Sequence, residues 1–205
     1  MNDLTDRLYE QVLVLRCQTG DGAAFGELVE RFAARLRYFV RTLLGKERQA
    51  DAEDVLQDVW LDVHRSIATL TDPGAIVAWL YRVARNRTVR HLRKRVTPTR
   101  TIEDSQADRE IDRGGDFSIE DAEAIHLALD SLAPEHREVL VLRFLEEMSY
   151  EGIATVTGCP VGTVRSRIHY AKLALRRVLE TNDHDAERSR QGPFEARRDR
   201  IIRPP

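Results

Sequence analysis

This chain of 205 residues lacks several features that mark common protein classes. Cys17 and Cys159 are its only cysteines, too few and too far apart for a disulfide framework or a metal cluster. Aromatic residues make up 6% of the chain and glycines number 11, which argues against an all-β protein rich in tight turns. No apolar run approaches the roughly 18 residues of a membrane span, and the first residues, MNDLTDRLYEQ, lack the order of a signal peptide. We therefore expect a soluble protein of the reducing cytoplasm.

Signatures of catalysis are also missing. The six histidines are scattered, and none shows paired ligand spacing beside carboxylates. No glycine-rich phosphate loop and no nucleophile elbow occurs in the sequence. We expect no enzyme activity, no catalytic residue, no cofactor and no metal site, and we interpret both cysteines as packing residues.

Charge is arranged in blocks, although the net charge is only −2. Eight cations and no acid lie between positions 78 and 100, whereas nine acids and two arginines lie between positions 103 and 123. Residues 98–118 have almost no apolar content, so they cannot bury enough surface to offset the entropy lost on ordering. This segment is predicted to be a flexible acidic linker between two domains.

Helical periodicity occupies both sides of that linker. The predicted fold is all-α: two small helical domains joined by the acidic linker, the second a helix-turn-helix domain. Asp21 is expected to cap a helix that Gly45 ends. The main apolar stripes are Val55, Val59, Val63 and Ile67; Ile76, Leu80, Val83 and Ala84; and, after Pro134, Val139, Leu140, Leu142 and Leu145. The predicted boundaries are 1–97, 98–118 for the linker, 119–180, and 181–205 for a disordered tail.

A helix-turn-helix is predicted from SYEGIATVTGCPVGTVRSRIHYAKLALRRVLE, residues 149–180. Ser149 can cap the first helix, and Gly158 suits the left-handed residue that ends it. The second helix carries an apolar stripe at Val164, Ile168, Ala171, Leu175 and Val178, with cations on another face. Such a helix enters the DNA major groove with its amino end. The alternative is a basic, solvent-facing helix in a plain bundle.

Two further surfaces are predicted in the first domain. The cation-rich stretch favours phosphate as a partner, because neutralised phosphates release counterions. Trp79 and Tyr81 add flat rings on which an unstacked base could rest. In DAEDVLQDVWLDVH, an acidic edge with an apolar patch suits a protein with basic helices. The alternatives are a basic face balanced by the linker and an ordinary solvated helix face.

These motifs occur in a characteristic order. DAEDVLQDVWLDVH, AWLYRVARNRTVRHLRKR and LAPEHREVLVLRFLEEMSYEGIATVTGCPVGTVRSRIHYAKLALRR follow one another, separated by the acidic linker. The chain thus resembles an extracytoplasmic-function (ECF) sigma factor of bacterial RNA polymerase over residues 8–180. The resemblance implies an alternative sigma factor that binds core polymerase and directs promoter-specific transcription initiation. Its implied partners are the clamp helices of the largest polymerase subunit and promoter DNA, with no membrane and with an anti-sigma factor as a candidate regulator.

The resemblance also implies three sets of contact residues. The polymerase-binding set is Asp54, Gln57, Asp58, Leu61 and Asp62. The set that recognises and opens the −10 element is Thr71, Asp72, Trp79, Arg82, Arg85, Asn86, Arg90 and Arg93, with a base flipped near the loop 70–75. The set that reads the −35 element is Thr163, Arg165, Ser166, Arg167, His169, Tyr170 and Lys172.

Three residues depart from the family pattern. Gly152 replaces a better helix former, at a cost of about 1 kcal/mol in a helix interior. Tyr170 replaces a common arginine, and Arg90 stands where aspartate or asparagine is frequent. Two other interpretations stay open: a DNA-binding regulator that acts without polymerase, which leaves the acidic edge unexplained, and a helical adaptor, which leaves both basic faces unused.

Overall fold

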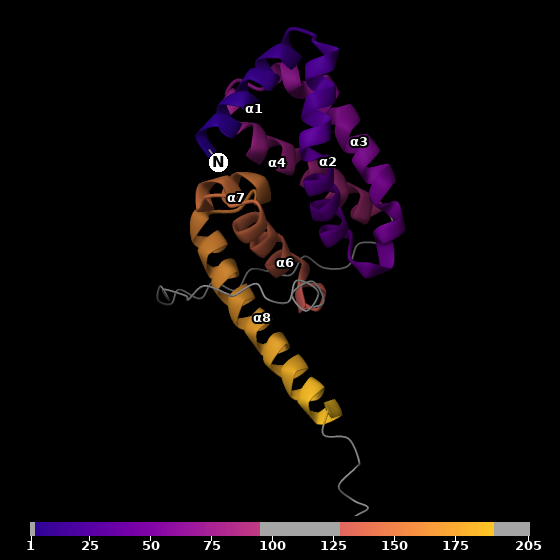
Figure 1. The fold of residues 1–205 in the computed structure, drawn as a ribbon, viewed down its shortest axis with the longest axis vertical. Helices are drawn as coiled ribbons and strands as arrows, with labels where there is room; N and C mark the ends of the chain where they lie inside the picture. The colour runs from indigo at the N-terminus through magenta and orange to yellow at the C-terminus, as the bar shows by residue number, and fades with distance from the viewer. Residues whose placement is uncertain (1–2, 95–127, 191–205) are drawn as a thin grey trace, which may run out of the picture.

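Two helical units make up the computed structural model, which describes residues 3–94 and 128–190 (Figure 1). The first contains α1 (Asp3–Gln18), α2 (Gly22–Leu44), η1 (Lys46–Asp51), α3 (Ala52–Ser66), η2 (Ile67–Thr69), η3 (Pro73–Ala75) and α4 (Ile76–Lys94). The second contains α6 (Pro134–Leu140), η4 (Val141–Leu145), α7 (Tyr150–Thr157) and α8 (Val161–Arg190). The all-α prediction is confirmed, since the described ranges contain no strand.

Some of the predicted segments lie outside the residues that the structure describes. The predicted linker, 98–118, lies beyond the described residues, as does 191–205 of the predicted tail. α8 extends to Arg190, ten residues past the predicted end of the second domain at 180.

Side-chain chemistry sets the ends of the long helix α2. The Asp21 carboxylate accepts hydrogen bonds from the backbone N–H groups of Ala23 at 2.9 Å and Ala24 at 3.1 Å. The Ala24 bond and the Arg16 guanidinium lower the pKa of Asp21, because both favour the charged carboxylate. Gly45 ends the helix at φ 72°, a conformation that favours glycine. Both predicted ends are therefore confirmed.

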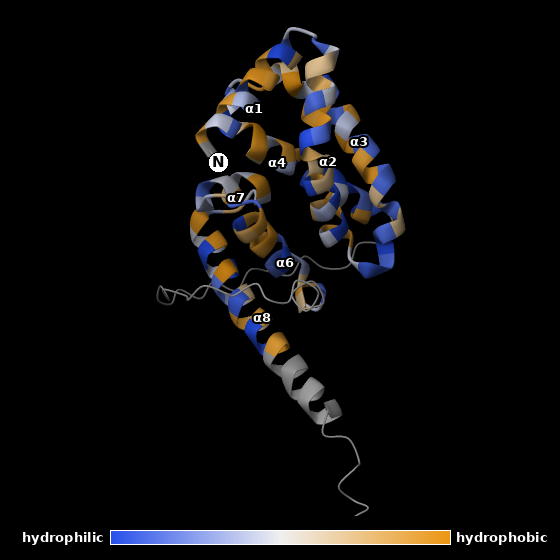
Figure 2. Cartoon of the chain, viewed as in Figure 1, coloured by the Kyte–Doolittle hydropathy of each residue, from blue (hydrophilic) through white to orange (hydrophobic). Residues whose placement is uncertain are grey.

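The predicted apolar stripes build the core of the first unit. Val55, Val59, Val63 and Ile67 are buried in the core, as predicted, and α3 packs against α2. Figure 2 shows apolar and hydrophilic residues mixed along each labelled helix, which is the pattern of amphipathic helices packed on a shared core. Tyr81 is completely buried, so the prediction that its ring is available to a base is wrong.

The helix-turn-helix prediction is confirmed in its local chemistry. The Ser149 hydroxyl accepts a hydrogen bond from the Gly152 N–H at 3.0 Å and so caps α7. Gly158 ends α7 in the left-handed conformation, at φ 71°. The predicted inner stripe of α8 is buried at Val164, Ile168, Ala171 and Leu175.

One apolar position of the preceding segment was predicted wrongly. Leu145 was expected on the buried stripe but is 52% exposed. Its segment, η4, is a π-helix, in which the Glu146 N–H bonds to the Val141 carbonyl five residues back at 3.2 Å. The extra residue in this turn rotates the following side chains away from the α-helical register, so Leu145 faces outward.

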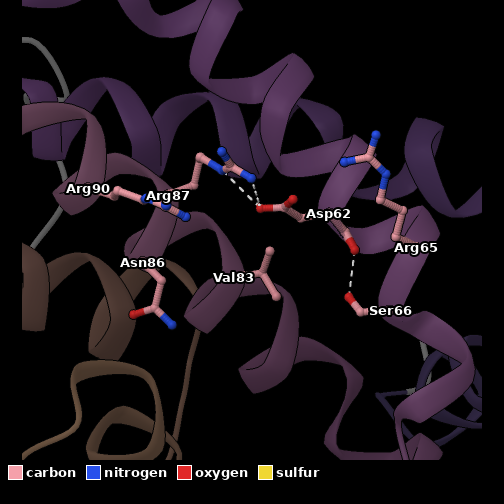
Figure 3. A pocket seen from close by; sticks show the side chains of 7 residues that line it. All are labelled: Asp62, Arg65, Ser66, Val83, Asn86, Arg87 and Arg90. Atoms are coloured by element: carbon pink, nitrogen blue, oxygen red, sulfur yellow. Dashed lines mark hydrogen bonds and ion pairs between the residues drawn. The ribbon is translucent and has the colours of Figure 1, made fainter. Parts of the chain in front are cut away.

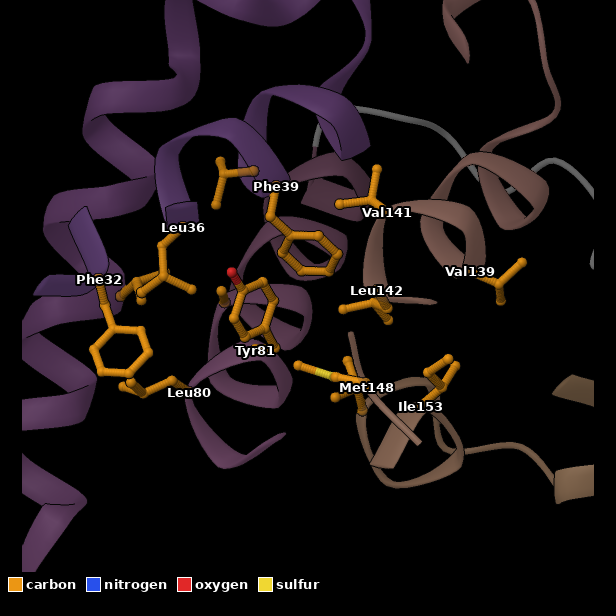
Figure 4. Packing of buried hydrophobic residues seen from close by; sticks show 14 of the residues in the cluster. Phe32, Leu36, Phe39, Leu80, Tyr81, Val139, Val141, Leu142, Met148 and Ile153 are labelled. Atoms are coloured by element: carbon orange, nitrogen blue, oxygen red, sulfur yellow. The ribbon is translucent and has the colours of Figure 1, made fainter. Parts of the chain in front are cut away.

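The two units share one core. α4 packs against α7, and α2 packs against α6. Figure 4 shows Phe39 and Tyr81 of the first unit facing Leu142 and Met148 of the second. The Phe39 and Tyr81 rings lie edge to face with centroids 5.0 Å apart. All these residues belong to a single buried cluster, an arrangement that the sequence analysis did not anticipate.

Gly152 occupies a position where a side chain is expected to stabilise the protein. It lies in the first turn of α7, and a Cβ there would contact the Ser149 hydroxyl at 3.4 Å and Met148 Cβ at 3.7 Å. We expect Gly152→Glu to complete a capping box with Ser149 and to raise the free energy of unfolding by about 0.5–1 kcal/mol. Urea unfolding followed by circular dichroism measures the change. Gly158→Glu is the matched control and should lower stability, because that residue has a positive φ; destabilisation by Gly152→Glu would contradict the capping geometry.

Candidate nucleic-acid and partner interfaces

The outer face of α3 presents an acidic edge with an apolar centre. Asp54, Gln57 and Asp58 are exposed, and Leu61, about one helical turn after Gln57 and Asp58, is 46% exposed. They lie on the face opposite the buried valine stripe, because the two sets alternate at helical spacing. Asp62 is half-buried at the margin of this face.

Arg87 of α4 reaches across to this acidic edge. Its Nε donates to Asp62 Oδ2 at 2.9 Å, and its Nη1 lies 3.4 Å from Asp58 Oδ2. The hydrogen bond to Asp62 raises the pKa of Arg87. The acidic edge and the basic run were predicted to be separate faces. Instead, Arg87 of the basic run is paired with Asp58 and Asp62, two members of the predicted polymerase-binding set.

A second face of α4 is exposed and basic. Arg82, Asn86, Arg90 and Arg93 are exposed at spacings of four, four and three residues, so they follow one side of the helix. Trp79 lies half-buried against the core. This face brings together four of the eight residues of the predicted −10 set.

A cleft of about 380 Å³ lies between α3 and α4 beside this face. Figure 3 shows the side chains that line it: Asp62, Arg65, Ser66, Val83, Asn86, Arg87 and Arg90. Its lining therefore contains three arginines, one carboxylate and one side-chain amide. Arg65 and Ser66 were missed by the sequence analysis, which placed α3 only on the acidic side. Val83 was expected inside the core but is half-buried on the cleft wall.

The loop before α4 is held in place by its own polar groups. The Asp72 carboxylate accepts a hydrogen bond from the Gly74 N–H at 2.8 Å. The Gln18 amide donates to the carbonyls of Ile67 at 3.1 Å and Leu70 at 2.7 Å, which ties the loop to α1. Thr71 and Asp72 are exposed at the loop surface, where the −10 set was expected to begin.

Arg85 does not join the exposed face of α4. Its Nε donates to Glu138 Oε1 of α6 at 2.5 Å, and the Glu138 side chain is 5% exposed. Burial raises the pKa of Glu138, an effect that Arg85 and then Arg167 oppose. Arg85, a member of the predicted −10 set, therefore lies at the boundary between the two units.

The first turns of α8 carry the predicted −35 set. Arg165 and Tyr170 are exposed, and the Tyr170 ring lies edge to face with that of His169, with centroids 5.3 Å apart. The Ser166 hydroxyl donates to the Thr163 carbonyl at 3.0 Å. Thr163, Ser166, His169 and Lys172 are half-buried.

Arg167 of the same predicted set points inward. Its Nη1 lies 3.8 Å from Cys159 Sγ, and its Nε is buried. Arg167 is half-buried with its guanidinium toward the turn residue Cys159, whereas Arg165 is exposed.

Neither metal-binding clusters nor membrane spans were found in the described part of the chain. No group of three or more histidine, cysteine or acidic side chains there could hold a metal ion. Within residues 3–94 and 128–190, no helix is both long enough and apolar enough to cross a bilayer. Cys17 and Cys159 are free thiols, half-buried against the apolar cluster.

Two family models match this chain. The model of sigma-70 region 2 matches residues 28–97, which contain the acidic edge, the cleft and the basic face of α4. The model of sigma-70 region 4 matches residues 122–175, which contain the helix-turn-helix. A regulator without polymerase and a helical adaptor, the two other interpretations of the sequence, do not account for both matches.

Characterised relatives extend over nearly the whole chain. The RNA polymerase sigma-H factor of Pseudomonas aeruginosa is 32% identical over 184 residues, covering 83% of this chain and 94% of that protein. The ECF RNA polymerase sigma-E factor of Escherichia coli is also 32% identical, covering 84% of this chain and 95% of that protein.

Solved structures agree with these relatives. CnrH, solved in complex with the cytosolic domain of CnrY, aligns with a TM-score of 0.60 at 25% identity, covering 84% of this chain and 98% of that one. The sigma factor RpoE of Bartonella quintana, solved with the anti-sigma factor NepR, has the same fold, with a TM-score of 0.58 at 24% identity and coverage of 76% and 96%. The chain belongs to the ECF sigma factors of RNA polymerase, which direct promoter-specific initiation of transcription and are not enzymes.

Proposed function

We propose that this sigma factor binds core RNA polymerase through the acidic edge of α3, opens the −10 element with α4, and reads the −35 element with the start of α8. The observation that carries this assignment is the separation of charge on the surface. One helix exposes acids around a leucine, whereas two other helices expose cations and hydrogen-bonding groups. Because DNA repels the first surface and attracts the other two, a protein partner and a nucleic-acid partner can bind at the same time.

The polymerase contact centres on Asp54, Gln57 and Leu61. These side chains are exposed and share one face, so an incoming helix can cover Leu61 while its cations meet the carboxylates. Burial of the leucine supplies contact energy, and the surrounding charges favour a basic partner. The clamp helices of the largest polymerase subunit are the proposed partner.

Arg87 is proposed to orient the other two acids of this edge. Its contacts with Asp58 and Asp62 fix both carboxylates and join α3 to α4. A displacement of α3 on polymerase binding would therefore be transmitted through Arg87 to α4, the helix proposed to open DNA. Asp58 and Asp62 reach the partner with half of their charge already compensated by a neighbouring cation.

The −10 element is proposed to lie along Arg82, Asn86 and Arg90 and to enter the adjoining cleft. Arginines there can bind the phosphates of the separated strand, and the Asn86 amide can donate to and accept from a base edge. The exposed loop residues Thr71 and Asp72, which precede α4, are proposed to take part as well. Arg90, which departs from the family pattern, adds a cation to the cleft wall.

The −35 element is proposed to be read by Arg165, His169 and Tyr170. Arg165 is exposed on the first turns of α8, where a recognition helix meets base edges, and a guanidinium binds guanine O6 and N7 in a bidentate manner. Tyr170 supplies a ring and a hydroxyl where relatives often supply a cation.

The remaining assignments concern organisation and regulation. We propose domain boundaries at 1–97 and 119–180, with the acidic segment 98–118 between them and the chain acting in the cytoplasm. CnrH was solved in complex with the cytosolic domain of CnrY, and RpoE in complex with the anti-sigma factor NepR. By extension, an anti-sigma factor is proposed to bind this chain as well.

Reversing a charge on the acidic edge tests the polymerase contact. We expect Asp54→Arg to weaken binding to core polymerase by about 10-fold or more, because it sets like charges opposite each other. Pull-down with core polymerase over a concentration series measures the affinity. Glu30→Arg, at an exposed acid of α2, is the control and should bind like the wild type; equal binding by both variants would remove α3 from the interface.

The Arg87 contacts predict a stability effect specific to one arginine of α4. We expect Arg87→Glu to lower the free energy of unfolding by about 1 kcal/mol, since it brings a third carboxylate beside Asp58 and Asp62. Arg82→Glu reverses an exposed charge on the same helix and should change stability less. Urea unfolding measures the free energy of unfolding of both variants. An equal decrease in the two would contradict the positioning role of Arg87.

The −35 assignment predicts a loss of sequence discrimination. We expect Arg165→Ala to weaken −35 binding by about 1–3 kcal/mol and to relax the base preference at one position. Transcription from a promoter library randomised at −35 measures both effects. Arg176→Ala, farther along α8, is the control. Unchanged preference in the Arg165 variant would contradict its role.

Initiation itself is tested with core polymerase, this chain and a library of genomic fragments. We expect defined start sites that core polymerase alone does not use. Mapping these start sites gives the promoter sequence, and a complete absence of chain-dependent start sites would overturn the proposed function.

A further inference from the structure

One aromatic ring of the second unit contacts two arginines. Tyr150 is the first residue of α7, directly after the Ser149 cap. The guanidinium carbon of Arg143, in η4, lies 5.4 Å from the centroid of the Tyr150 ring. That of Arg165, in α8, lies 5.9 Å from the same centroid. Both distances are within the roughly 6 Å at which a guanidinium is attracted to the face of an aromatic ring. One ring thus joins three segments of the helix-turn-helix unit.

Two of these three side chains are fixed by other contacts. The Tyr150 ring is half-buried and packs against the apolar cluster, so the core sets its position. Arg143 Nη1 donates a hydrogen bond to the Met148 carbonyl at 2.9 Å, which holds this guanidinium beside the start of α7. Arg165 is exposed, and within residues 3–94 and 128–190 its side chain has no hydrogen bond or ion pair. Its contact with Tyr150 is therefore what restrains it.

Neither arginine is neutralised by an acid. Among the residues that the structure describes, no carboxylate forms an ion pair with Arg143 or Arg165, whereas Arg87 of α4 is paired with Asp62. Two cations over one ring repel each other. Arg143 is the fixed member of this pair, so its charge confines Arg165 to the rest of the ring. The uncompensated charge also suits an anionic ligand, which for a helix-turn-helix is DNA.

Restraint of this kind matters for a side chain that reads a base. A long exposed side chain samples many rotamers, and fixing one of them on binding costs entropy. A guanidinium that already lies over a fixed ring has lost part of this freedom before DNA arrives. Bidentate recognition of guanine also requires the guanidinium plane to face O6 and N7 together. A fixed ring beneath Arg165 therefore favours both its affinity and its discrimination between bases.

We propose that Tyr150 is a positioning residue for the −35 element: its ring, fixed by the core, holds the Arg165 guanidinium in the orientation that contacts a base edge. Arg143 limits the part of the ring that Arg165 can occupy. The proposal rests on the proposed −35 role of Arg165, and it adds two residues that lie outside the predicted −35 set. Tyr150 acts through Arg165 and does not itself read the base.

The test measures base preference with the full chain bound to core polymerase. Transcription from a promoter library randomised at −35 gives the preference at the position that Arg165→Ala relaxes. We expect Tyr150→Leu, which removes the ring, to weaken the preference at that same position by about 2- to 5-fold, the effect of losing a cation–π contact at an exposed site. Tyr150→Phe keeps the ring and should retain the wild-type preference.

Three comparisons separate positioning from a general loss of stability. In the Arg165→Ala background, Tyr150→Leu should cause no further loss of preference, because the side chain that the ring holds is gone. Tyr9→Leu is the matched control: it removes a ring 5.9 Å from the guanidinium carbon of Arg31 in the first unit and should leave the −35 preference unchanged. In ¹⁵N NMR spectra of the free chain, the Arg165 Nε–H signal should shift in Tyr150→Leu, which lacks the ring current, but not in Tyr150→Phe.

Three results would overturn the proposal: a wild-type preference in Tyr150→Leu, a Tyr150→Phe variant that behaves like Tyr150→Leu, or a further loss when Tyr150→Leu is added to Arg165→Ala. Circular dichroism checks that the leucine variant folds, and Tyr150→Met, which fills similar space without a ring, replaces it if it does not. An unchanged preference in Arg165→Ala would instead overturn the proposed −35 reading. The NMR comparison would still decide whether the ring holds the guanidinium.

Discussion

The angular placement of the arginines on α4 governs which surfaces of this protein can act. Successive residues of an α-helix are rotated by about 100°, so Arg82, Asn86 and Arg90 cluster on one side. Arg87 falls about 100° to one side of that cluster and Arg85 about 100° to the other. Arg87 meets the carboxylates of α3, Arg85 meets Glu138, and the cluster between them stays open. The arginines of α4 thus make two structural contacts, through Arg87 and Arg85, and form one exposed basic face.

This division explains how so basic a helix is stable without nucleic acid. Asp62 and Glu138 each compensate one arginine at the flanks, where burial would make an unpaired charge costly. The central cations stay in water, where their mutual repulsion is screened. Folding therefore requires no bound phosphate, whereas binding a phosphate at the exposed face requires no rearrangement of α4.

Local signals made most of the fold predictable, and non-local contacts account for the rest. Asp21, Ser149 and Gly158 act within a few residues of themselves, so their capping roles could be inferred directly from sequence. Leu145 was placed wrongly because a π-turn shifts the helical register. The pairing of Arg85 with Glu138 joins residues 53 positions apart, and no pattern within either helix indicates it. The exposed arginines were predictable as a group, but which of them faces the second unit depends on tertiary packing.

The acidic edge of α3 stays exposed while the two units are packed together. Asp54, Gln57 and Leu61 lie on α3, away from the contacts of α4 and α2 with the second unit, and they are open to a partner while the units stay together. Under the proposed polymerase assignment, a partner can therefore reach this edge while the two units stay packed together. Separating the units would expose the apolar cluster that they share, so their contact is stabilised by burial as well as by the Arg35–Glu146 and Arg85–Glu138 pairs.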